Sequence, residues 1–145
     1  MTLFHDASDF RAFVALLRSV TRRFRWELHA WCLMPNHFHL VLTALRLDLS
    51  AGMHRLNGLY AQRFNDRYAR TGHVFQNRFG ARLIEREDYL EVACEYVLAN
   101  PVRAGLADSP GCWPWSGSAS PSSPSPRGEH PPAWTPASRA AGDRS

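Results

Sequence analysis

Two histidines one residue apart, His37 and His39, lie in the stretch WCLMPNHFHLVL between Trp31 and Leu42. In an extended strand, side chains at positions i and i+2 point to the same face, about 6.5–7 Å apart along the chain. Two imidazoles placed in this way can turn toward one cation, while Phe38 between them faces the core. Such a metal site needs a further ligand from elsewhere in the chain. The alternative is that both histidines lie on a solvated sheet face.

A tyrosine and an asparagine, Tyr96 and Asn100, are four residues apart in EYVLANPVRAGL. In a helix this spacing puts both side chains on one face, within reach of each other. Tyrosine can act as a nucleophile and form a covalent intermediate, but its unperturbed pKa of about 10 requires help from a base or a metal. Tyr89 is a second candidate for the same role. The alternative is that Tyr96 packs in the core among apolar neighbours.

An arginine-rich segment, HRLNGLYAQRFNDRYARTGHVFQNRF, mixes basic, aromatic and amide side chains. Basic groups contact phosphates, whereas aromatic and amide groups stack on or hydrogen-bond to bases, so the segment favours nucleic acid. All 17 Lys+Arg residues are arginines and the formal net charge is +4, which by itself is weak support for an anionic partner. The alternative is a solvated helix face whose aromatic residues lie in the core.

Hydrophobic periodicity predicts the elements that position these residues. Ser8-Asp9 is predicted to cap a first helix that runs to about Arg23. Alternation of apolar residues from Arg25 predicts a strand, and MPN at 34–36 turns the chain into a second, antiparallel strand, HFHLVL. The predicted elements that follow this hairpin are a helix from Asp48 to about Tyr68, a strand in the stretch from Gly72, a helix from Glu87-Asp88 through Asn100 that Pro101 ends, and a turn at NPVRAGL.

The composition changes near Trp115, after which Ser, Pro, Ala and Gly dominate. Such a segment buries too little apolar surface to offset its ordering entropy, so we expect a folded unit over residues 1–116 and a disordered tail over residues 117–145. The first residues lack the features of a signal peptide, and no apolar run is long enough to span a membrane. Three scattered cysteines, Cys32, Cys94 and Cys112, are typical of a reducing compartment, and we expect a cytoplasmic protein.

Four stretches, CLMPNHFHLVL, GMHRLNGLYAQRFN, GHVFQNRF and YVLANPVRAGL, together resemble the single-tyrosine HUH transposases, especially the REP-associated tyrosine transposases of bacteria. The resemblance covers roughly residues 3–116. It implies an α+β, ferredoxin-like (βαββαβ-type) fold, an antiparallel sheet with helices on one face, and a C-terminal catalytic helix. Members of the family begin with another strand ahead of the region that LFHDASDF resembles, so we expect that this first strand is missing here.

The resemblance also implies a role for the candidate residues. His37, His39 and Asn100 match the metal ligands, with Mg²⁺ or Mn²⁺ as the cofactor, and Tyr96 matches the nucleophile. The substrate that the resemblance implies is single-stranded DNA near a hairpin or palindrome, which the enzyme would nick and rejoin through a 5′-phosphotyrosine intermediate. The expected DNA contacts are Arg55, Arg63, Gln76, Arg78 and Arg103.

Two other interpretations stay open. One is a truncated, catalytically inactive remnant that binds DNA without cleaving it, and the other is a regulatory domain that binds zinc or nickel. Either a monomer or a homodimer is compatible with the sequence, and we expect association with the bacterial nucleoid.

Overall fold

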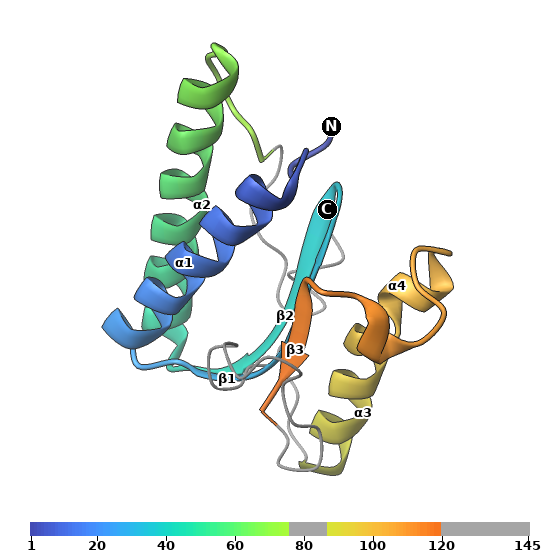
Figure 1. Ribbon diagram of the computed structural model, residues 1–145. Coiled ribbons are helices and arrows are strands. Elements are labelled where there is room, and N and C mark those ends of the chain that lie inside the picture. Colours follow the sequence, from blue (N-terminus) through green and yellow to red (C-terminus); the bar gives the residue numbers. More distant parts are fainter. Residues whose placement is uncertain (76–86, 120–145) are drawn as a thin grey trace.

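The computed structural model describes residues 1–75 and 87–119, and a three-stranded antiparallel sheet lies at the centre of this part of the chain (Figure 1). The strand order is β2-β1-β3. The expected α+β class is confirmed. In chain order the elements are α1 (Ala7–Arg23), β1 (Glu27–Met34), β2 (His37–Thr43), α2 (Arg46–Tyr68), α3 (Glu87–Leu98), α4 (Asn100–Arg103), a short 3-10 helix (Pro110–Cys112) and β3 (Ser116–Ser118).

The predicted hairpin is confirmed, with β1 ending at Met34 and β2 beginning at His37. Its register places Met34 opposite His37 and Cys32 opposite His39. The register shifts between Leu28 and Ala30, so a bulge forms at His29. Because a bulge inserts one residue, it moves the following side chains to the other face of the sheet. Beyond the bulge the strand is buried on both faces, because its residues belong to the hydrophobic clusters on both sides of the sheet.

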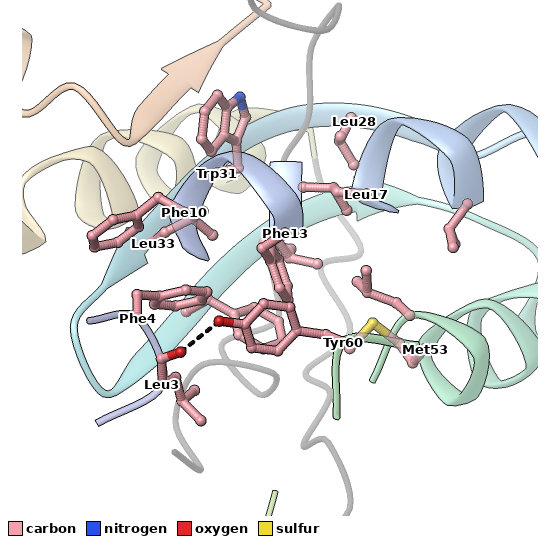
Figure 2. Close-up of a cluster of buried hydrophobic side chains, with 14 of the residues drawn as sticks. Leu3, Phe4, Phe10, Phe13, Leu17, Leu28, Trp31, Leu33, Met53 and Tyr60 are labelled. Atoms are coloured by element: carbon pink, nitrogen blue, oxygen red, sulfur yellow. Dashed lines mark hydrogen bonds between the residues drawn. The ribbon is translucent and has the colours of Figure 1, made fainter. Parts of the chain in front are cut away.

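The helices α1 and α2 cover one face of the sheet and enclose the larger core (Figures 1 and 2). Phe38 points into this core, as predicted, and its ring centroid lies 4.8 Å from that of Phe13. The hydroxyl of Tyr60 donates to the backbone carbonyl of Leu3, which joins the N-terminal segment to α2 (Figure 2). Fully buried side chains in this core include Phe13, Leu17, Leu28, Trp31, Leu33, Leu40, Met53, Leu56 and Tyr60.

The helix α3 covers the opposite face, and α4 follows it on the same side (Figure 1). A second, smaller cluster forms there from Ala30, Cys32 and Met34 of β1, together with Val41 of β2 and Val97 of α3. The histidines of β2 are the cross-strand partners of Cys32 and Met34, and cross-strand partners share a face. The side of the sheet that carries α3 is therefore also the side that carries the histidines.

The first helix begins two residues earlier than the sequence predicts. Asp6 is its N-cap and accepts a hydrogen bond from the backbone N–H of Asp9, so Ser8 and Asp9 are already inside the helix. Asp9 turns inward instead, and its carboxylate accepts hydrogen bonds from Arg63, Arg67 and the hydroxyl of Tyr68. Tertiary contacts to α2 therefore decide which acidic residue caps the helix.

The last predicted helix is broken. It ends at Leu98 instead of continuing through Asn100, and Asn100 begins the four-residue helix α4, which replaces the predicted turn. Pro101 explains the break, because it has no N–H to donate to the preceding turn of α3. Gly105, with φ +77°, ends this region.

The C-terminal end of the described chain adds a strand that the sequence does not predict. β3 pairs with β1 in antiparallel register, with Gly117 opposite Trp31. The SGS sequence of β3 contains no β-branched or aromatic residue, so it gives no strand signal. This pairing extends ordered structure past residue 116, where we expected the folded unit to end. Most of the strand expected from Gly72 lies outside the described residues.

Candidate active site

The two histidines of β2 lie side by side on the α3 side of the sheet. Their ring centroids are 5.0 Å apart and their planes are nearly perpendicular, at 86°. The rings are thus closer than the about 6.5–7 Å that separates positions i and i+2 along a strand, so they incline toward each other. His39 is buried and His37 is half-buried. The predicted shared face is confirmed.

Asn36 fixes the orientation of the first histidine ring. Its side-chain oxygen lies 2.7 Å from Nδ1 of His37. Because an amide oxygen can only accept, Nδ1 carries the proton and Nε2 keeps its lone pair. Burial lowers the pKa of His37, which also favours the neutral ring. Both effects leave Nε2 able to bind a cation. Sequence reasoning used Asn36 only as a turn residue, although its position next to the histidine pair is the signal for this role.

The candidate nucleophile lies on α3. Val97 anchors that helix to the sheet, whereas the neighbouring Tyr96 is 56% exposed. Core packing, the alternative interpretation of Tyr96, is therefore wrong. Tyr89 is equally exposed, so exposure does not distinguish the two tyrosines. The surroundings of Asn100 distinguish the two tyrosines, because Arg103 contacts both Asn100 and the Tyr96 ring.

Arg103 contacts both members of the predicted Tyr96–Asn100 pair. Its guanidinium carbon lies 3.9 Å from the centroid of the Tyr96 ring, and Nη2 donates to the Tyr96 backbone carbonyl at 3.0 Å. Nη2 also donates to Oδ1 of Asn100. The amide nitrogen of Asn100 is buried and has no hydrogen-bond partner in the described part of the chain. The pair is thus assembled through Arg103, since the helix that was expected to hold it is broken.

The packing of α3 on the sheet connects the element that carries Tyr96 with the strand that carries the histidines. Helix α3 contacts both β1 and β2. Burial raises the pKa of the Cys32 thiol, and the positive charge of Arg103 opposes that shift, so Arg103 acts electrostatically on the residue directly opposite His39. No group of three or more His, Cys, Asp or Glu side chains in residues 1–75 and 87–119 could hold a metal ion. A cation on the two imidazoles would need an amide, phosphate or water oxygen as its third ligand.

The residues expected to contact DNA are spread over the molecule. Arg55 is exposed on α2, on the opposite side of the sheet from α3. Arg63, on the same helix, binds the buried carboxylate of Asp9 at 2.7 Å. Gln76 and Arg78 lie outside the described residues. Arg103 is exposed and lies next to Tyr96.

A comparison with known protein families identifies the family of this chain. The family described as "Transposase IS200 like" matches residues 3–100, a range that contains the paired histidines, Tyr96 and Asn100. The chain belongs to the IS200-like transposase family. Comparisons with curated proteins and with solved structures found no match.

Membership of this family means that the transposase is a DNA-processing protein, and the α+β arrangement is consistent with the family. The family implies that the partner is DNA. No helix in the described part of the transposase is long and apolar enough to cross a membrane.

Proposed function

We propose that this transposase is a metal-dependent endonuclease that nicks and rejoins single-stranded DNA next to a hairpin. The single observation that carries the proposal is that a close pair of inclined imidazoles and an exposed tyrosine occur on the same side of the sheet. Ring pairs of this kind suit a cation, and an exposed phenol is accessible to a large substrate such as a DNA strand.

His37 and His39 would hold Mg²⁺ or Mn²⁺, with Oδ1 of Asn100 as the third ligand. Nε2 of His37 is the suitable nitrogen, since Asn36 occupies Nδ1. An amide oxygen has two lone pairs, so Oδ1 of Asn100 can accept from Arg103 and still bind a cation. The metal, when bound, would polarise the scissile phosphate and offset the charge that develops on it.

The phenol oxygen of Tyr96 would attack the phosphorus. A Tyr96–phosphorus bond forms as the bond from phosphorus to the 3′ oxygen breaks, and the phenolic proton ends on the leaving 3′-hydroxyl. The products are a 5′-phosphotyrosine and a free 3′-hydroxyl. The number of phosphoester bonds is unchanged, so attack by the same or another 3′-hydroxyl rejoins DNA without ATP.

Incubation with a labelled, hairpin-flanked single-stranded oligonucleotide and Mn²⁺ tests the proposal. We expect a covalent protein–DNA adduct that requires the metal and is lost in Tyr96→Phe. Tyr89→Phe is the matched control, because this second tyrosine of α3 has the same exposure. We expect His37→Ala to lose the adduct as well.

Other outcomes distinguish the alternatives. DNA binding with a steep salt dependence but no adduct with any divalent metal would indicate the non-catalytic DNA-binding protein. An adduct that survives Tyr96→Phe would remove this residue from its proposed role. Stoichiometric zinc or nickel binding without affinity for DNA would favour the regulatory domain.

A further inference from the structure

The break between α3 and α4 raises the question of what holds Tyr96 and Asn100 together. In one continuous helix the i, i+4 spacing would do so. Here α3 ends at Leu98, and Asn100 is the first residue of a separate, four-residue helix. A helix of one turn has little stability of its own, so its orientation depends on contacts with the rest of the molecule.

Pro101 of α4 is buried, and Arg103 adds contacts that connect α4 to Tyr96 and Asn100. It is the last residue of α4, and it reaches back to three groups: the Tyr96 ring, the Tyr96 backbone carbonyl and Oδ1 of Asn100. The guanidinium lies over the ring at 3.9 Å from its centroid, well inside the range of about 6 Å in which a cation is attracted to an aromatic face. The hydrogen bond to the carbonyl at 3.0 Å uses an acceptor in the last turn of α3.

We propose that Arg103 is a positioning residue that holds the Tyr96 ring and the Asn100 amide together across the break between α3 and α4. This inference rests on the proposed function, because it assigns Arg103 to the reaction of Tyr96. Arg103 acts through two other residues, and this role differs from the DNA contact that the sequence resemblance implies for it.

The guanidinium group is required for its shape as well as for its charge. It is planar, so one face can stack on an aromatic ring while its edge donates to two oxygens. A lysine keeps the charge but offers one compact ammonium group, which cannot stack and donate in this way. By donating to Oδ1 of Asn100, Arg103 also decides which way that amide points, and the buried nitrogen is turned away from it.

Two roles of Arg103 predict different kinetics. If it only contacts a DNA phosphate, Arg103→Ala weakens DNA binding and leaves the rate of adduct formation at saturating DNA unchanged. If it positions Tyr96 and Asn100, the saturated single-turnover rate falls, by about 10- to 100-fold, because a misplacement of about 1 Å has effects of this size. Arg103→Lys should bind DNA like the wild type but keep the slow rate. Guanidinium ion should partly restore the rate of Arg103→Ala, whereas ammonium should not.

Arg11→Ala is the matched control, since Arg11 is an exposed arginine of α1 on the other side of the sheet. We expect it to keep the wild-type rate and to show no response to guanidinium. Thermal unfolding of both variants should match the wild type, because Arg103 is exposed too. An unchanged saturated rate in Arg103→Ala would overturn the inference while leaving the proposed function intact.

A second measurement does not depend on enzymatic activity, so it also tests the inference if no adduct forms. The chain is labelled with 3-fluorotyrosine, and the ¹⁹F resonance of residue 96 is assigned as the one that Tyr96→Phe removes. If Arg103 packs on this ring in solution, Arg103→Ala shifts that resonance and leaves the other tyrosine resonances in place. Arg11→Ala should shift none of them. A resonance that stays in place in Arg103→Ala would contradict the inference whatever the activity.

Discussion

Cys32 of β1 lies directly opposite His39 of β2, and both side chains are buried on the face of the sheet that α3 covers. Burial raises the pKa of this thiol well above its ordinary value, so the sulfur stays protonated at neutral pH. A neutral thiol is a poor nucleophile and a poor metal ligand. The proximity of the two residues thus does not by itself make a zinc site.

Thiol labelling tests this finding. In the native protein we expect maleimide to modify the exposed Cys112 quickly and Cys32 only after unfolding, as peptide mass spectrometry would show. We also expect Cys32→Ala to retain the metal requirement of the adduct reaction. If Cys32→Ala instead abolishes metal binding, the sulfur is a ligand and the zinc interpretation gains support.

Asp9 is a buried ionised group in the packing of α1 against α2. It is fully buried and binds Arg63 and Arg67 at 2.7 and 2.5 Å, so replacing it removes the counter-charge of Arg63 and leaves Arg67 paired with Asp6 alone. We expect Asp9→Asn to lower the free energy of unfolding by about 2–4 kcal/mol, measured by urea denaturation. Asp66→Asn, at an exposed site on α2, should change it by less than about 0.5 kcal/mol.

The same carboxylate predicts a dependence of stability on pH. Burial disfavours its charge, but hydrogen bonds from Arg63, Tyr68, the His5 N–H and Arg67 outweigh that effect and lower the pKa of Asp9 to about 2. The unfolded state therefore binds the proton more readily than the folded state, and stability rises with pH over this range. We expect up to about 2 kcal/mol to be present above pH ~4 and lost as the pH falls toward ~2. Acid titrations of Asp9→Asn should lack this component.

Two glycines of α2 predict opposite effects of the same substitution. A Cβ on Gly52 would lie 2.2 Å from the buried ring of Trp26, so Gly52→Ala forces the helix away from that ring. We expect Gly52→Ala to lower the free energy of unfolding by about 1–3 kcal/mol. A Cβ on the exposed Gly58 would meet no atom within 4 Å. Gly58→Ala should therefore raise the free energy of unfolding by about 0.5–1 kcal/mol, because alanine has the higher helix propensity. Thermal unfolding of the two variants gives the comparison, and equal shifts would contradict this packing of Trp26.

Arg55 predicts a change in the salt dependence of DNA binding. If it contacts one phosphate of single-stranded DNA, Arg55→Ala should reduce the slope of log K against log salt by about 0.7, measured by fluorescence anisotropy. Arg11→Ala should leave the slope unchanged. An unaltered slope in Arg55→Ala would indicate that Arg55 does not contact DNA and that it lies on a solvated helix face, which is the alternative interpretation.

Local patterns in the sequence determined the β-hairpin and the shared face of the two histidines. Alternation set the hairpin, Pro35 and Asn36 set its turn, and a strand period of two put His37 and His39 on one side. The exposure of Tyr96 was not determined in this way, because the spacing of its neighbours on α3 by itself favoured core packing.

Tertiary structure decided what depends on contacts between distant segments. β1 is buried on both faces because α1 and α2 pack on one side and α3 on the other, and Asp9 binds Arg63 of α2 instead of capping α1. β3 pairs with β1, and Gly117 lies close against Trp31, although the sequence of β3 has no strand propensity. Sequence spacing gave the Tyr96–Asn100 pair, but Pro101 breaks the helix that would have held it, and only folding brings Arg103 onto both residues. Periodicity fixes which face a side chain takes within one element, whereas the meeting of separate elements depends on packing that no local pattern encodes.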